Sequence, residues 1–91
     1  MMTQAEEQFA AKCKVLSVPA LRSIYEWQYK CAHGALFRAS SAKRAGAPDM
    51  CSLWLGSFQR ERSFARIARR ELLNRREAFE RELAEDVNSG S

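Results

Sequence analysis

The side chains with the clearest chemical potential are arginines, which are concentrated in one part of the chain. Seven arginines lie between positions 60 and 76, against two acids. Arg62, Arg66 and Arg70 recur at a spacing of four, which places them on one face of a helix with no acid among them. Like charges at this spacing cost roughly a few tenths of a kcal/mol per pair, and an anionic partner would offset that cost. The row therefore indicates a partner that carries negative charge.

The charge reverses directly after the arginines. From Glu77 to Asp86 there are five acids and one base, Arg81. Glu71 and Arg75 stand in the stabilising i,i+4 order, and we interpret this pair as structural. The same interpretation holds for Glu77 and Arg81. Two alternatives stay open for the arginine row: a solvated helix face, or the acidic segment of a second subunit lying antiparallel against it. In the second case the arginines serve assembly and need no nucleic acid.

Aromatic and basic side chains also gather before the arginine row. On a helical wheel, one cluster contains Arg22, Tyr29, His33 and Phe37. Exposed rings interleaved with cations can stack on bases and pair with phosphates, although the same face could instead pack on the first helix or on a second subunit. The candidate nucleic-acid contacts predicted from all these patterns are Tyr29, Phe37, Arg38, Lys43, Arg44, Arg60, Arg62, Arg66 and Arg70.

The chain shows no residue pattern typical of an enzyme or of a metal site. It has no glycine-rich phosphate loop and no nucleophile–base–acid set, so we predict no catalytic residue, no metal and no cofactor. Cys13, Cys31 and Cys51 form no C-x-x-C pair, and the single histidine cannot complete a usual zinc spacing. Buried free thiols are typical of a reducing compartment. Because we also find no secretory signal and no apolar run that could cross a bilayer, we expect a soluble cytoplasmic protein without a membrane partner.

Two helices are predicted in the first part of the chain. Thr3 and Glu6 match a capping box, which satisfies the first free amides of a helix over residues 3–17. Pro19 disfavours helical geometry at the residue before it and suits the first position of a second helix, over residues 19–41. Apolar residues recur at helical spacing in both segments, so we expect one face of each to be buried.

A loop and one long helix are predicted for the rest. Residues 40–50 are small and polar, which predicts a loop with Asp49 as the N-cap of the next helix. That helix is predicted over residues 50–87, followed by a disordered tail at 88–91. Its apolar residues occupy two sides, and its C-terminal half has few residues of the chain to pack against. We therefore predict a single all-α domain over residues 1–91 that forms a helical homodimer.

Two short segments match a known sequence pattern. The residues that fall in register without a gap are Gly34, Arg38, Ser52, Trp54, Leu55 and Gly56. On these residues the chain resembles ribosome modulation factor over residues 28–61, with Phe58 where that family has a second tryptophan. The family consists of small basic bacterial proteins with a helix–loop–helix fold. The loop departs from the pattern, because Lys43, Arg44 and Ala45 stand where the family has Cys-Pro-Tyr.

The resemblance implies association with ribosomal RNA and down-regulation of translation, with Arg38 as the only basic residue carried over. The matching residues also predict a helix-packing motif. Gly34 and Gly56 would let two antiparallel helices approach closely, while Trp54 and Phe58 fill the seam between them.

Two functions follow from these patterns. The first is a small, basic, helical RNA-binding protein that associates with the ribosome and regulates translation; the net charge of +4 suits it. The alternative is a non-catalytic protein-interaction module, such as a small inhibitor or adaptor from a mobile element, that docks through its long helix. A duplex-DNA regulator is a weaker option, because the predicted loop is too long for a helix-turn-helix.

Overall fold

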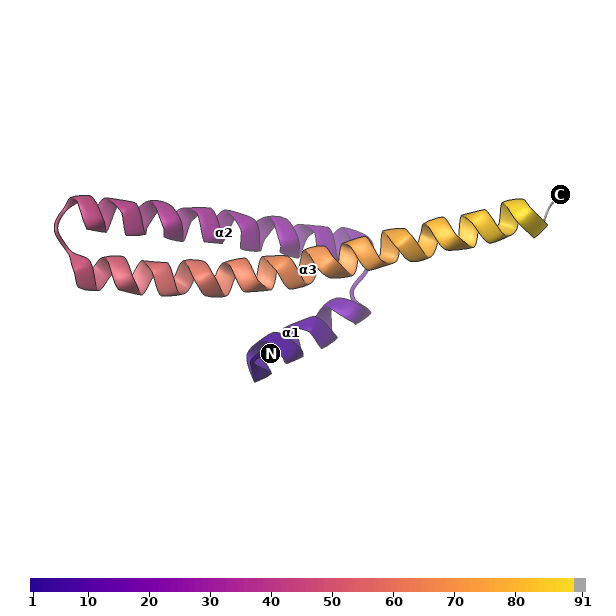
Figure 1. The fold of residues 1–91 in the computed structure, drawn as a ribbon, viewed down its shortest axis with the longest axis horizontal. Coiled ribbons are helices and arrows are strands. Elements are labelled where there is room, and N and C mark those ends of the chain that lie inside the picture. The colour runs from indigo at the N-terminus through magenta and orange to yellow at the C-terminus, as the bar shows by residue number, and fades with distance from the viewer. Residues whose placement is uncertain (90–91) are drawn as a thin grey trace.

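Three helices follow one another along the chain: α1 (Gln4–Val15), α2 (Val18–Arg44) and α3 (Pro48–Ser89). The computed structural model of the chain describes residues 1–89, and the predicted all-α class is confirmed for them. α2 and α3 form an antiparallel hairpin, and α1 packs against α3 beside the open end of that hairpin (Figure 1). Within the described part of the chain, no helix is long and apolar enough to cross a membrane.

Local signals determine where the first two helices begin. The predicted capping box of α1 is confirmed: the Thr3 hydroxyl accepts a hydrogen bond from the Glu6 N–H, and the Glu6 carboxylate accepts one from the Thr3 N–H, both at 3.2 Å. α1 ends at Val15, two residues earlier than predicted, because Leu16 and Ser17 have extended backbone. The Ser17 hydroxyl then accepts a 3.3 Å hydrogen bond from the first turn of α2, so this helix begins one residue before the predicted start.

The predicted loop at 40–50 is wrong in length, since only residues 45–47 are non-helical. α2 ends in a Schellman motif, in which the N–H of Ala47 donates to the carbonyl of Ala42 at 2.9 Å. Gly46 supplies the left-handed residue that this motif requires, at φ 73°. One glycine in the right place therefore reverses the chain, and the polar residues before it stay helical.

α3 begins directly after this turn. Pro48 occupies the first helical position, where its missing N–H costs nothing. Asp49 consequently lies inside the first turn, where a carboxylate is favoured by the helix dipole, and the predicted N-cap role of Asp49 is wrong. The predicted tail at 88–91 is also wrong at its start, because α3 continues to Ser89. The remaining two residues lie outside the described part of the chain.

The core is small and lies where the three helices meet. Cys13 of α1, Leu21 of α2 and Ala68 of α3 are each fully buried. The half-buried side chains packed around them are Phe9, Leu16, Tyr25, Ile67 and Leu72. Toward the closed end of the hairpin, the buried residues of α2 are the alanines at positions 32, 35 and 39. Small side chains therefore allow α2 and α3 to lie close together along the hairpin.

The prediction that two glycines bring the helices together is wrong. A methyl group placed on Gly34 or Gly56 would meet nothing within 4 Å, so neither glycine lies at a close helix contact. Trp54 and Phe58 are half-buried, and Trp54 lies against Arg38 of α2, but Leu55 of the same motif is 40% exposed. The buried alanines of α2 make the close approach that the glycines were expected to make.

Replacing Gly34 or Gly56 by Ala is therefore expected to stabilise the protein. Both glycines lie inside helices, where Gly costs about 0.5–1 kcal/mol relative to Ala. Because the added methyl group has free space, each variant should raise the free energy of unfolding by about that amount in urea titrations followed by circular dichroism. A destabilised variant would mean that the glycine does mark a close helix contact.

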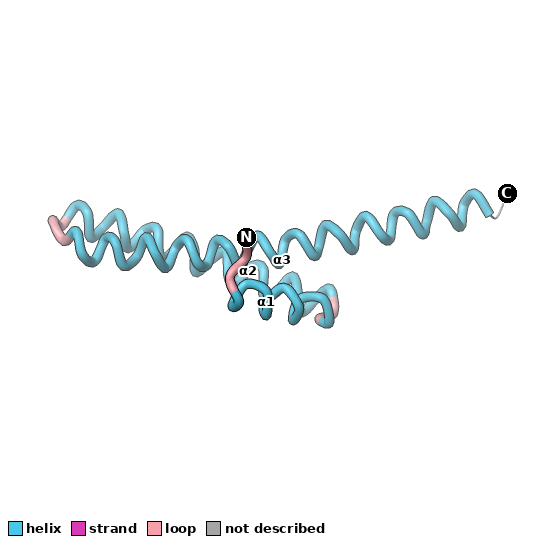
Figure 2. Tube along the Cα trace, turned by 60° about the horizontal axis from the view of Figure 1, so that its bottom comes forward, coloured by secondary structure: helices cyan, strands magenta, loops and turns pink. Residues whose placement is uncertain are grey.

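α3 is much longer than its partner in the hairpin. It has 42 residues and α2 has 27, so α3 continues past the start of α2 into solvent (Figure 2). Val18, the first residue of α2, lines a hollow with Arg76 and Phe79 of α3, which marks where the hairpin stops. We call residues 76–89 the α3 extension.

Candidate nucleic-acid interface

Four exposed arginines run along the middle of α3, and we call them the arginine strip: Arg62, Arg66, Arg69 and Arg70. α2 covers the side of α3 that carries the buried Ala65 and Ala68. α1 covers another side, where the rings of Phe9 and Phe64 lie 4.9 Å apart. The strip occupies the solvent-exposed side between them. Within residues 1–88, none of the four arginines forms an ion pair.

Cations from both neighbouring helices border the strip. Lys14 of α1 lines a hollow with Arg66 and Arg70. Arg22 of α2 lines a second hollow with Arg69. Glu71 also borders the first hollow, but its carboxylate accepts a hydrogen bond from Arg75. The strip and its two neighbours therefore present six positive charges on adjoining surface, which attract an anionic chain.

Aromatic side chains follow one another along α2 on the same face of the hairpin. We call these four residues, spaced by four, the ring row: Tyr25, Tyr29, His33 and Phe37. The centroids of the Tyr25 and Tyr29 rings are 6.1 Å apart, and those of Tyr29 and His33 are 4.5 Å apart. Tyr29 is 51% exposed and Phe37 68% exposed. Tyr25 lines the hollow that holds Arg69, so the ring row and the arginine strip border one another.

One arginine of the strip rests on a ring of its own helix. The guanidinium carbon of Arg62 lies 5.9 Å from the centroid of the Phe58 ring. Such a contact orients the guanidinium group while its N–H groups remain available to a ligand. Phe58, predicted only as a packing residue, therefore also supports the strip.

The other predicted cations do not join this surface. Arg38 lies over the Trp54 ring, 4.7 Å from its centroid, in a hollow that also contains Trp27. Trp27 lines a further hollow with Phe9 of α1, so Arg38 lies on the α1 side of the hairpin. Arg60 lines a hollow with the start of α1, and Lys43 and Arg44 lie in the last turn of α2. Of the seven predicted cations, Arg62, Arg66 and Arg70 lie together, and Arg69 joins them.

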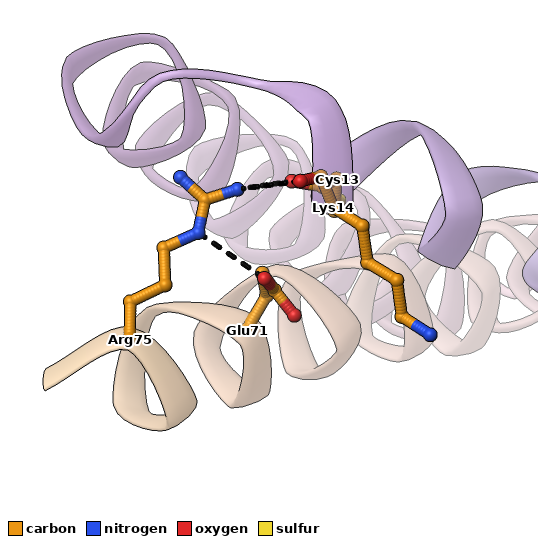
Figure 3. Close-up of polar contacts among 4 residues, drawn as sticks. All are labelled: Cys13, Lys14, Glu71 and Arg75. Carbon is orange, nitrogen blue, oxygen red and sulfur yellow. Dashed lines mark hydrogen bonds and ion pairs between the residues drawn. The ribbon is translucent and has the colours of Figure 1, made fainter. Parts of the chain in front are cut away.

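Arg75 has a structural role that holds α1 in place. Its Nη2 donates hydrogen bonds to the carbonyl oxygens of Cys13, at 2.8 Å, and Lys14, at 3.2 Å (Figure 3). Its Nε donates to Glu71 Oε1 at 3.1 Å, which confirms the predicted Glu71–Arg75 pair. The last carbonyls of a helix have no partner within the helix. The Cys13 carbonyl also accepts a 3.4 Å hydrogen bond from the Leu16 N–H, and Arg75 adds donors to the carbonyls of Cys13 and Lys14 at the end of α1.

Replacing Arg75 by Gln is expected to lower the free energy of unfolding by about 1.5–3 kcal/mol, the range for hydrogen bonds to a charged group. The neighbouring Arg76 offers a matched control, because it also pairs with a glutamate four residues away, Glu80, at 3.1 Å. That pair is exposed, so Arg76→Gln should cost less than about 0.5 kcal/mol. Urea unfolding in dilute solution measures both, and equal losses would contradict the capping role of Arg75.

A different i,i+4 pair from the predicted one forms near the start of the α3 extension. Arg76 donates to Glu80, whereas Glu77 and Arg81 form no ion pair among the described residues. Both pairs have the i,i+4 spacing, but the rule favours the acid-first order of Glu77 and Arg81, so the pair that forms has the less favoured order.

The one buried thiol near the strip is not poised for chemistry. Burial raises the pKa of the Cys13 thiol above its ordinary value of 9.0; Glu71 raises the pKa further, and Arg75 opposes both. The thiol is therefore protonated at neutral pH, in which state it is a weak nucleophile. No group of three or more His, Cys, Asp or Glu side chains that could hold a metal is found among the described residues.

Comparisons with known proteins add no relative. No family model, no curated protein and no solved structure matches the chain. The resemblance of residues 28–61 to ribosome modulation factor stays a prediction.

Proposed function

We propose that this protein binds RNA through the arginine strip and the ring row, and that it acts on the ribosome as a modulator of translation. The observation that carries the proposal is the strip: four exposed guanidinium groups without an ion-pair partner in residues 1–88, bordered by Lys14 and Arg22. The acidic α3 extension projects away from the strip and does not neutralise it within the chain (Figure 1).

RNA is favoured over duplex DNA by the ring row. Unpaired bases stack on exposed aromatic side chains, and sequence recognition in RNA commonly uses such bases. Tyr29 and Phe37 offer exposed rings, and the row to which they belong borders the cations at Tyr25, which lines a hollow with Arg22 and Arg69. The length of the loop no longer argues against a helix-turn-helix, since the turn has only three residues. The antiparallel packing of α2 and α3 argues against a helix-turn-helix, because that motif joins its helices at about 90–120°.

The cellular setting is part of the proposal. A cytoplasmic protein meets ribosomes and keeps its thiols reduced, and the three cysteines of this chain are free. The match to the helical pattern of ribosome modulation factor supports ribosomal RNA as the target, although Arg38 is engaged with Trp54. The strip would then provide the main RNA contact.

Binding of a labelled single-stranded RNA at increasing salt tests the proposal. With four to six phosphate contacts, affinity should fall by roughly 50-fold or more between about 50 and 200 mM salt. A single-stranded RNA should bind more tightly than a DNA duplex of the same length, because only unpaired bases can use the ring row. An affinity that does not change with salt would overturn the proposal.

Copurification from native lysate, with and without nuclease, separates the two functions predicted from the sequence. An RNA-binding protein should recover ribosomal RNA, and nuclease should remove the ribosomal proteins that come with it. One stoichiometric protein that survives nuclease would favour the protein-interaction module instead.

A further inference from the structure

Both tryptophans of the chain line one hollow between α2 and α3, and we call it the tryptophan hollow. Trp27 contributes from α2 and Trp54 from α3. The hollow has a volume of about 410 Å³, within the range of sites that hold a small molecule. Trp27 is 65% exposed, so its ring can stack on a ligand. None of the four arginines of the arginine strip lines this hollow.

Gly34 leaves open space in the α2 wall of the hollow. A methyl group placed on it would meet nothing within 4 Å, although the glycine lies in the middle of a helix. Glycine is unfavourable at such a position relative to alanine. A larger side chain at this position would occupy the hollow, so the glycine keeps room for a ligand.

The hollow carries two cations and one carboxylate. Arg38 lies over the Trp54 ring at 4.7 Å, which orients its guanidinium group and leaves N–H groups available to a ligand. Lys30 also lines the hollow and is exposed. With Glu61 as the one acid, the net charge of the lining is positive. An anionic ligand is therefore favoured over a cationic one.

The carboxylate in the hollow is half-buried and has no partner. Glu61 forms no ion pair and accepts no hydrogen bond from any residue that the structure describes. α3 has no basic residue three or four positions away from it. A carboxylate has two acceptor oxygens and no donor, so two neighbouring N–H groups of a ligand would satisfy it best.

Guanine is the base that offers two such donors. Its Watson–Crick edge carries N1–H and the 2-amino group side by side. Adenine and cytosine each have one amino group next to an acceptor, and uracil has one N–H between two carbonyls. Bases stack on exposed aromatic rings, and phosphates bind guanidinium and ammonium groups. A guanine nucleotide therefore has the ring, the paired donors and the negative charge that this hollow fits.

We propose that the tryptophan hollow binds a guanine base that carries a phosphate. The base stacks on Trp27 and donates two hydrogen bonds to Glu61, while Lys30 and Arg38 hold the phosphate. A free guanine nucleotide and an unpaired guanine of an RNA share this chemistry. The site does not depend on the proposed function, because the arginine strip lies outside the hollow.

Binding of guanosine diphosphate to the full chain tests the proposal. Isothermal titration calorimetry gives its affinity, and the intrinsic fluorescence should change on binding because both tryptophans line the hollow. Adenosine diphosphate should bind at least about tenfold more weakly, because it leaves the carboxylate without its paired donors. A single-stranded RNA with one guanine, compared with the same RNA carrying adenine there, tests the second source of the base. A preference for guanine in either form supports the site.

Two substitutions separate the role of the carboxylate from that of the ring. Glu61→Gln keeps the shape of the side chain and should weaken guanosine diphosphate about tenfold or more, with little effect on adenosine diphosphate. Trp27→Ala should weaken both nucleotides about tenfold or more, since stacking does not distinguish the bases. Glu77→Gln is the matched control for the charge, because Glu77 is exposed and outside the hollow; it should bind like the parent.

Filling the hollow tests its location. Gly34→Leu should keep the helices by circular dichroism, because the position has free space, and should abolish nucleotide binding. The proposal is overturned if neither guanosine diphosphate nor guanine in RNA is preferred over its adenine counterpart. Equal losses for both nucleotides in Glu61→Gln, or unchanged binding in Gly34→Leu, also overturn it. The triple replacement of Arg62, Arg66 and Arg70 by Glu should bind guanosine diphosphate like the parent, so the hollow and the arginine strip are tested separately.

Discussion

Replacing Arg62, Arg66 and Arg70 together by Glu is expected to lower RNA affinity by roughly 1,000-fold at moderate salt, because three phosphate contacts are lost and three repulsive charges replace them. All three side chains are exposed and form no ion pair among the described residues, and the one ring contact, of Arg62 with Phe58, lies within α3, so the fold should be kept. Fluorescence anisotropy with a labelled single-stranded RNA measures the loss. The slope of log affinity against log salt should fall by about two units, since each lost contact contributes about 0.7.

The chain offers a control with the same change in charge. Lys43, Arg44 and Arg60 are also exposed, but they lie away from the strip, in the last turn of α2 and beside the start of α1. Their joint replacement by Glu should lower RNA affinity by less than about tenfold, because it changes only the overall electrostatic potential of the protein and removes no direct contact with RNA. Equal losses in the two triple variants would mean that binding follows net charge and that the strip is not the site.

Most of the fold could be predicted from the sequence, because its signals are local. The capping box at Thr3 and Glu6 and the break before Pro19 each act within one helical turn. The predicted loop at 40–50 is too long because the Schellman motif at Gly46 needs only three non-helical residues, and the small polar residues before it stay in α2. Polarity alone does not end a helix that can still form its backbone hydrogen bonds and bury one face.

The arginine strip was partly predictable for a similar reason. A spacing of four within one helix fixes which of its arginines share a side, and Arg62, Arg66 and Arg70 do so. What the sequence does not provide is which arginines the chain itself engages. Arg75 binds carbonyl oxygens 61 and 62 residues earlier in the chain, and Arg38 lies over Trp54 on another helix. Those contacts depend on how the helices pack. Arginines that look alike in the sequence therefore have different roles, some in contacts within the chain and some exposed to solvent.

The predicted close helix contact at Gly34 and Gly56 is wrong for a further physical reason. A pattern such as Gly34 and Gly56 marks a close helix contact only if both glycines face the same seam. Here the seam is lined by the alanines of α2, and both glycines lie to the side of it. A register difference of one or two residues, which a short sequence match does not reveal, is enough to move a glycine out of a helix contact.

Replacing Leu21 by Ala is expected to lower the free energy of unfolding by about 2–4 kcal/mol. Leu21 is fully buried between Cys13 of α1 and Ala68 of α3, and both neighbours are too small to fill the space that the change would leave. Leu53→Ala removes the same atoms from a side chain that is 61% exposed, and should cost less than about 0.5 kcal/mol. Urea unfolding in dilute protein measures both changes without a contribution from self-association. A loss below about 1 kcal/mol for Leu21→Ala would contradict a core shared by all three helices, because only at a loosely packed site does removing a leucine side chain lower the free energy of unfolding so little.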